Sequence, residues 1–154
     1  MAVAIRQASK DDIPRIVVVV NLAFRVHDIL VGERTSEAEV RRLLKTSTFF
    51  VAVDGQSIVG VVEIQANGTS AYLAMLAVDP RFQRSGIGGA LQEHAEDYCR
   101  TLGCLEVTLT TGSVRPELIQ YYGRLGYKII GIEPQPGELQ FKMKFDFVRM
   151  VKRL

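Results

Sequence analysis

The chain has 154 residues, of which 47% are hydrophobic, and this is enough to build one compact domain with a sizeable core. Its 19 lysines and arginines nearly balance its 17 aspartates and glutamates, so the net charge of +2 provides no strong field for nucleic acid or an anionic membrane. Because the longest apolar run, residues 16–20, cannot span a membrane and residues 1–9 lack a signal-peptide pattern, we expect a single domain over residues 1–154 in the cytoplasm.

The N-terminal quarter of the chain predicts a strand followed by two helices. Residues 3–8 alternate as a short strand, and Ser9 with Asp12 forms a capping-box pattern ahead of apolar positions at helical spacing. The four consecutive valines at 17–20 favour a strand, but the capping pattern decides for a helix. Residues 27–35 show no clear period and predict a loop, after which the same capping pattern precedes a second short helix.

The next segment predicts an antiparallel meander of three strands, because Asp54-Gly55 and Asn67-Gly68 are strong hairpin signals between apolar runs. The strands are expected at residues 49–53, 58–66 and 69–78. The third strand is apolar on both faces, so it belongs in the middle of a covered sheet. Simple alternation places Leu73, Met75 and Ala77 on one face, and Tyr72, Ala74, Leu76 and Val78 on the other.

The second half of the chain predicts an alternation of helices and strands. A helix follows the glycines at 86–89, and the strand after it completes a right-handed parallel crossover. The remaining elements are a strand at 104–111, a helix from Pro116, a strand at 127–132, a turn at 134–137 and a last strand at 139–145. The basic tail, residues 147–154, is expected to be a solvated end. Cys99 and Cys104 are spaced for neither redox chemistry nor zinc, so we expect buried thiols and no metal.

The glycines before the third helix need an explanation, because Gly86, Gly88 and Gly89 weaken its first turn by roughly 2–3 kcal/mol. A glycine-rich turn between a strand and a helix exposes N–H groups that suit a phosphate, and Arg81 and Arg84 lie alongside. The alternative is that the glycines allow tight packing of the helix on the sheet. The spacing excludes a P-loop and disfavours a dinucleotide-binding oxidoreductase.

Two motifs carry a resemblance to the GNAT superfamily of acyl-CoA-dependent N-acyltransferases. Residues 83–88, QRSGIG, resemble its Arg/Gln-x-x-Gly-x-Gly/Ala motif, and residues 115–128, RPELIQYYGRLGYK, resemble its second signature. The order of elements along the whole chain agrees. The resemblance implies an α/β (α+β) fold with a mixed central sheet of about six to seven strands and four helices. It also implies an antiparallel N-terminal meander and a splayed parallel pair of strands around the cofactor.

The resemblance implies that acetyl-CoA is the co-substrate, with its pyrophosphate on the glycine turn. The corresponding residues here are Gln83, Arg84, Ser85, Gly86, Ile87, Gly88 and Gly89. Arg81 or Arg84 could contact a phosphate, or Arg81 could be a solvated charge. The pantetheine arm would lie between the strands at 72–78 and 105–110, bonded to the backbone of Leu76, Ala77 and Val78.

The resemblance identifies the catalytic residues less completely than the residues that bind the cofactor. Tyr122 is similar to the family tyrosine that donates to the departing sulfur, although it could instead be a core aromatic; Tyr121 is out of register with the motif. Many relatives carry a Glu near the start of the strand where this chain has Tyr72. Glu63 on the neighbouring strand is therefore the candidate base, acting directly or through water, unless it is an exposed edge charge. Arg115 replaces an Asn of many relatives and either pairs with an acidic group of the acceptor or is a solvated helix-start charge.

The predicted activity is transfer of an acetyl group to a primary amine by direct attack within a ternary complex. The sequence does not identify the acceptor, which is a small molecule, an amino acid or a peptide. His27 and Glu33 of the predicted loop either face the acceptor or are solvated loop residues. A homodimer is left open. The alternative function is a CoA-binding module with little or no transferase activity, because the expected carboxylate is missing.

Overall fold

The computed structural model describes residues 3–135, 137 and 139–154. Pro136, which belongs to the predicted turn at 134–137, lies outside the described residues. The helices are α1 (Ile13–Arg25), α2 (Glu37–Leu43), α3 (Ile87–Thr101) and α4 (Pro116–Arg124), with short 3-10 helices at Lys10–Asp12 and Pro80–Phe82. The strands are β1 (Ala4–Gln7), β2 (Thr48–Asp54), β3 (Ser57–Asn67), β4 (Ser70–Val78), β5 (Glu106–Gly112), β6 (Lys128–Glu133) and β7 (Phe147–Arg153).

The strands form one mixed sheet in the order β1-β2-β3-β4-β5-β7-β6. The meander β2-β3-β4 is antiparallel, and both of its turns contain a glycine with positive φ, Gly55 at 63° and Gly68 at 66°. Among the described strands, β4 and β5 form the one parallel pair, joined by the crossover through α3. The predicted class, meander and parallel crossover are therefore confirmed.

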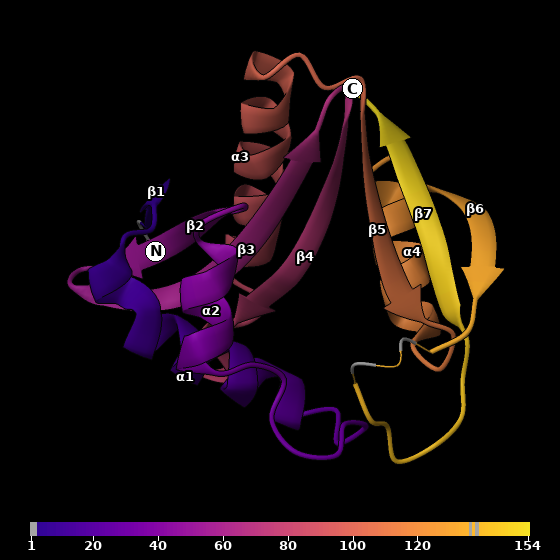
Figure 1. Ribbon diagram of the computed structural model, residues 1–154, viewed down its shortest axis with the longest axis horizontal. Coiled ribbons are helices and arrows are strands. Elements are labelled where there is room, and N and C mark those ends of the chain that lie inside the picture. The colour runs from indigo at the N-terminus through magenta and orange to yellow at the C-terminus, as the bar shows by residue number, and fades with distance from the viewer. Residues whose placement is uncertain (1–2, 136, 138) are drawn as a thin grey trace.

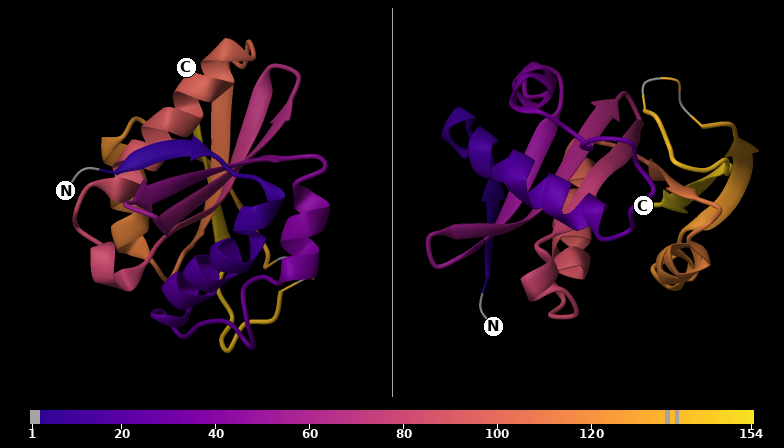
Figure 2. Two further views of the ribbon diagram at one scale, coloured as in Figure 1. Left: turned by 90° about the vertical axis from the view of Figure 1, so that its left-hand side faces the viewer. Right: turned by 90° about the horizontal axis from the view of Figure 1, so that it is seen from below.

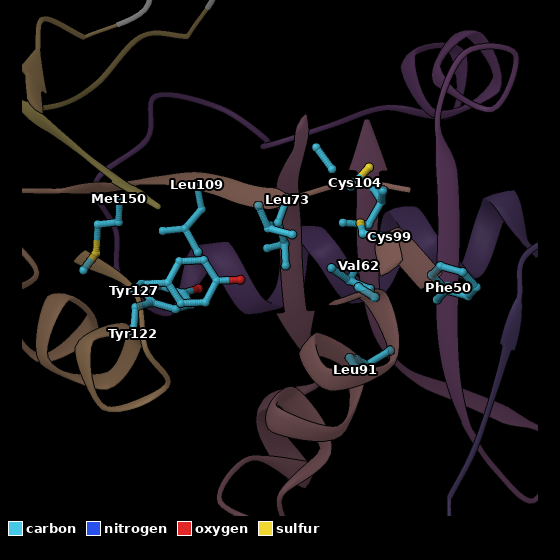
Figure 3. Packing of buried hydrophobic residues seen from close by; sticks show 14 of the residues in the cluster. Phe50, Val62, Leu73, Leu91, Cys99, Cys104, Leu109, Tyr122, Tyr127 and Met150 are labelled. Atoms are coloured by element: carbon cyan, nitrogen blue, oxygen red, sulfur yellow. The ribbon is translucent and has the colours of Figure 1, made fainter. Parts of the chain in front are cut away.

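Two helices cover each face of the sheet (Figures 1 and 2). On one face, α1 and α2 bury a cluster that includes Ile16, Val20 and Val40 against β2 and β3. On the other face, α3 and α4 cover a larger cluster, in which Leu91 lies against the first half of the sheet and Tyr122 against the second (Figure 3). No described helix is long and apolar enough to cross a membrane.

The sheet opens between β4 and β5. These strands pair only where Ser70–Tyr72 faces Glu106–Thr108, at the beginning of each strand. Beyond this point β5 stays paired with β7 as far as Gly112, and β4 runs away from it with β3 (Figure 1). The edge of β4 that faces the opening therefore has no strand partner from Leu73 onward, and its backbone polar groups are available to another molecule.

A β-bulge in β4 breaks the expected alternation of its side chains. Met75 has a φ of 50°, and the register against β3 shifts between Val61 and Glu63. As a result Leu73 packs into the cluster under α3, whereas Met75 and Ala77 pack into the cluster under α1. The prediction that these three residues share one face is wrong, because an extra residue in one strand reverses the face of every residue after it.

The last strand lies later in the chain than predicted. Residues 139–145 form no strand beyond a single bridge between Phe141 and Leu30, whereas the tail expected to be solvated forms β7. β7 pairs with β5 along its whole length and buries Val148 and Met150. Apolar and polar residues alternate in both segments, so the pattern alone does not choose between them. The partner strand does, because β7 supplies hydrogen-bond partners for the backbone groups of β5 that would otherwise lie at an open edge.

Candidate functional site: two adjoining cavities at the open end of the sheet

The turn after β4 presents a row of backbone N–H groups without acceptors. Asp79 accepts the N–H of Arg81 at 3.0 Å, and α3 begins at Ile87 after Gly86, whose φ of 83° favours glycine. Within the described part of the chain, no N–H group of residues 83–89 donates to a backbone or side-chain acceptor. Free amides at a helix start carry partial positive charge, so this turn suits an anion such as a phosphate.

The glycines of this turn are not needed for packing. A Cβ added at Gly88 or Gly89 would lie 3.7 and 3.8 Å from its nearest neighbour, which is ordinary contact distance. Gly60 of β3 is different, because a Cβ there would lie 2.8 Å from Leu91 Cδ1 and 3.0 Å from Ile87 Cγ2. Helix packing therefore explains Gly60, whereas Gly88 and Gly89 leave an open cradle that a ligand can approach closely.

The two arginines near the turn differ in what they contact. Arg81 donates to Asp79 through Nη2 at 2.8 Å and through Nε at 3.2 Å, and this bonding lowers the pKa of the Asp79 carboxyl. Arg15 reaches the same carboxylate at 3.3 Å. Arg84 makes no such pair within the described residues and lines the cavity over the turn. Of the two predicted phosphate contacts, Arg84 is therefore the better placed.

Two cavities adjoin at the open end of the sheet. The first, here named the loop cavity, has a volume of about 490 Å³ and lies over the turn. It is lined by most of the residues predicted to bind acetyl-CoA: Leu76, Ala77, Val78, Gln83, Arg84, Gly86, Ile87, Gly88, Gly89 and Tyr122. Arg81 and Ser85 are not among its described lining residues, and Ser85 donates its hydroxyl to the Phe82 carbonyl.

The second, here named the aromatic cavity, has a volume of about 360 Å³ and lies between β4, β5, the end of α1 and the segment 139–147. The residues that line both cavities are Phe24, His27, Leu76, Arg115, Leu118 and Tyr122. They form the boundary at which a ligand in one cavity can contact a ligand in the other.

Tyr122 occupies this boundary. It is buried on α4, with its ring 5.2 Å from that of Tyr121 and 5.8 Å from that of Tyr127. Its ring projects from the α4 side of the sheet toward Leu109 and Leu73 (Figure 3). Within the described part of the chain, its hydroxyl forms no hydrogen bond, and burial raises its pKa well above the ordinary value of 10.0. A protonated phenol with no partner is able to donate to a ligand.

Glu63 lies away from both cavities. It is 1% exposed, so it is not an exposed edge charge, and its Oε2 accepts a bond of 2.9 Å from Gln65 Nε2. It pairs across the sheet with Ala74, which lines the aromatic cavity, but Glu63 is not among the described lining residues. Tyr72, in the position where many relatives carry Glu, lines the aromatic cavity and bonds Thr110 Oγ1 at 2.8 Å.

Sequence reasoning left His27 and Arg115 without a preferred role, yet both line the boundary. The Arg115 side chain is only 17% exposed and pairs with Glu117 in the first turn of α4. Partial burial, with the nearby charge of Arg115 as a further cause, lowers the pKa of His27 below 6.5, so its imidazole is neutral at pH 7. No sequence signal marks His27, because it lies in a loop without periodicity.

Comparison with known families gives a match to one family model. The model described as "Acetyltransferase (GNAT) family" matches residues 19–127, a range that includes the glycine turn and the residues common to both cavities. A search of curated proteins finds no match.

Solved structures show the same fold over the full chain. Ard1 from Thermoplasma volcanium is 26% identical, with a TM-score of 0.82 over 100% of this chain and 99% of that chain. The ribosomal-protein-alanine N-acetyltransferase from Brucella melitensis is 19% identical, with a TM-score of 0.83 over 98% and 99%. The PaiA N-acetyltransferase from Thermoplasma acidophilum, solved in complex with coenzyme A, is 19% identical, with a TM-score of 0.79 over 100% of both chains.

Proposed function

This chain belongs to the acetyltransferase (GNAT) family and is an acyltransferase, and on that premise we propose that it transfers an acetyl group from acetyl-CoA to a primary amine. The transfer proceeds by direct attack of the amine within a ternary complex. Acetyl-CoA occupies the loop cavity, and the amine enters from the aromatic cavity. The observation that carries this proposal is the row of free N–H groups at residues 83–89 in a cavity that leads to the unpartnered Tyr122 hydroxyl.

The residues of the loop cavity fit the cofactor. The N–H groups of residues 83–89 hold the pyrophosphate, the open space at Gly88 and Gly89 accommodates its oxygens, and Arg84 adds a cation. The free edge of β4 at Leu76, Ala77 and Val78 supplies the hydrogen bonds that the pantetheine amides require. Arg81, which Asp79 already holds, neutralises that carboxylate instead of contacting a phosphate.

Tyr122 assists departure of the thiolate. As the amine nitrogen bonds to the acetyl carbonyl carbon, the carbon–sulfur bond breaks and negative charge develops on sulfur. The Tyr122 hydroxyl donates a hydrogen bond to that sulfur. Because burial raises the pKa of Tyr122, full proton transfer to a thiolate is uphill, and the phenol acts chiefly by stabilising the charge.

The amine must lose a proton, and His27 is the better placed group to accept it. Its imidazole is neutral at pH 7 and lines both cavities beside Tyr122. Glu63 is not among the described residues that line either cavity, so we expect it to take no direct part in the proton transfer. The variants His27→Asn and Glu63→Gln separate these roles: we expect the first to lower kcat/KM below that of the parent enzyme and the second to leave it within about twofold.

Binding and turnover test the proposal in two steps. Acetyl-CoA at a hundred times its dissociation constant stabilises by about 2.7 kcal/mol, which for this size raises Tm by roughly 5–10 °C. A thiol-release assay over a panel of amines then measures turnover. We expect Tyr122→Phe to keep acetyl-CoA binding and to lose roughly 10²- to 10³-fold in kcat, with Tyr121→Phe as the matched control.

Two outcomes of these measurements would contradict the proposal. An unchanged kcat in Tyr122→Phe removes this residue from the mechanism. Stabilisation by acetyl-CoA with no product from any amine identifies a CoA-binding module in place of a transferase.

A further inference from the structure

The aromatic cavity has a wall chemistry that limits which amines it accepts. Its volume of about 360 Å³ lies at the small end of the usual range for small-molecule sites, about 300–1,000 Å³. Much of the wall is apolar, including a cluster in which Phe141 lies 4.9 Å from Phe145 and Phe145 stacks on Phe147 at 5.7 Å. A ligand that fills this cavity therefore buries an apolar or aromatic group.

The charges in the same wall are of one sign. The side chains among its described residues that can carry a positive charge are His27, Arg34 and Arg115, and none of the described lining residues is an aspartate or a glutamate. Arg34 is 18% exposed, and its nearest carboxylate oxygen belongs to Glu39 at 3.9 Å. Arg115 donates through Nε to Glu117, while its Nη groups donate to no acceptor within the described residues.

Both guanidinium groups are poorly exposed, and each has one carboxylate neighbour, Glu39 for Arg34 and Glu117 for Arg115. Arg34 also lies 5.5 Å over the Phe24 ring. Their remaining donors at the cavity suit a further anion. A buried charge is costly unless it is paired, and guanidinium binds carboxylate through two parallel hydrogen bonds. Arg115 also lines the boundary beside Tyr122, so a carboxylate bound to it lies close to the site of transfer. A small acceptor that carries its carboxylate near its amine can therefore bind Arg115 and reach the boundary at the same time.

The same cations help to activate the amine. Positive charges nearby disfavour the ammonium form and so lower the pKa of the bound amine, which increases the fraction of neutral nucleophile. They also disfavour acceptors that carry several positive charges. The absence of a carboxylate base among the described wall residues is consistent with this route, because neutral His27 can accept the proton.

We infer that the acceptor is a free amino acid with an apolar or aromatic side chain, whose carboxylate binds Arg115 and is further stabilised by Arg34. The inference rests on the proposed function. The positive charge and the aromatic wall of the cavity identify the class of acceptor, and they exclude polyamines, aminoglycosides and long peptides as preferred acceptors.

A panel of related amines tests the inference directly. Thiol release is measured with L-phenylalanine, L-phenylalaninamide, spermidine and a pentapeptide that begins with phenylalanine. We expect kcat/KM for L-phenylalanine to exceed that for the amide by at least about tenfold, although the amide has the less basic amine. The other two should be poorer still, because spermidine lacks the anion and the peptide places it far from the amine.

Variants show whether the arginines cause this preference. Arg34→Gln and Arg115→Gln should each raise KM for L-phenylalanine by about tenfold and leave KM for the amide within about twofold. Arg34 does not line the loop cavity, so we expect acetyl-CoA binding to be unchanged in Arg34→Gln. The matched control is Arg25→Gln, because Arg25 pairs with Glu33 on the surface and does not line this cavity.

A binding measurement keeps the test independent of turnover. Calorimetry compares N-acetyl-L-phenylalanine with N-acetyl-L-phenylalaninamide, and the acid should bind at least about tenfold more tightly. Equal use of amide and acid, or better use of the peptide or spermidine, overturns the inference and leaves the proposed function standing. Binding of acetyl-CoA without thiol release from any amine overturns both.

Discussion

The loop cavity and the aromatic cavity adjoin, yet they are built in different ways. Much of the wall of the loop cavity comes from one continuous stretch, residues 76–89, which presents free main-chain N–H groups at residues 83–89. The wall of the aromatic cavity is made of side chains from α1, the loop after it, β4, β5, α4 and the segment 139–147. A ligand common to a family can be held by backbone, whereas discrimination among acceptors depends on side chains from distant parts of the chain.

The largest effect expected from this difference is at Gly88. A valine there places a side chain in the cradle and should weaken acetyl-CoA binding roughly 10- to 100-fold, because phosphate oxygens lose their charge-assisted hydrogen bonds. Calorimetric titration measures the change. Gly88 is a cleaner position than Gly86, whose positive φ makes any other residue strained.

The matched control is Gly123→Val on α4. A Cβ at Gly123 meets no atom within 4 Å, so this variant repeats the helix-propensity cost of the valine away from the turn. Equal affinities for acetyl-CoA in both variants would show that the pyrophosphate is not bound on the turn.

Gly60→Ala should affect stability instead of binding. The added Cβ would lie 2.8 Å from Leu91 Cδ1, inside a buried cluster, and overpacking of this kind costs about 1–3 kcal/mol. Chemical denaturation measures the free energy of unfolding, and we expect acetyl-CoA affinity to stay within about twofold. A variant as stable as the parent would mean that α3 moves away from β3 without cost.

The smallest effect concerns the electrostatics of the aromatic cavity. The Arg115 charge helps to hold the pKa of His27 below 6.5, so Arg115→Gln should raise this pKa. The sign follows because removal of a positive neighbour favours the protonated imidazole. The loss of activity as pH falls through this pKa should then begin at a higher pH.

An NMR titration measures the shift, and the chain contains just two histidines, His27 and His94. His94 lies against Phe50 at 4.7 Å, away from this cavity, so its resonances serve as the internal reference. A His27 titration that does not respond to Arg115→Gln would show that the two groups are not close in solution.

The elements that sequence predicted well depend on contacts between near neighbours. Ser36 caps α2 by accepting the Glu39 N–H at 3.2 Å, and the Asp-Gly and Asn-Gly turns close the meander, as their patterns predict. The α1 helix forms despite four consecutive valines, because Val19 and Val20 pack on the sheet. The glycine turn likewise has the local structure that its sequence predicts, with Gly86 at a φ of 83° and α3 beginning at Ile87.

The elements that sequence mispredicted depend on a partner elsewhere in the chain. The choice of residues 147–153 over 139–145 as the last strand follows from the open edge of β5, and the bulge at Met75 is visible only against β3. Both Glu63 and His27 are polar residues without a local pattern. Only the tertiary structure buries the first behind the cavity wall and brings the second to the boundary beside Tyr122.

The sequence by itself therefore determined the helices, the turns of the meander and the glycine-rich turn, because interactions between residues a few positions apart specify them. The order of strand, helix and strand predicted the crossover. The tertiary structure alone decided how far β4 and β5 diverge, which side chains meet at the boundary of the two cavities, and which charges face the acceptor. The physical reason is that those side chains come from segments as much as 98 positions apart, from Phe24 to Tyr122 at the boundary, and no local interaction specifies where they meet.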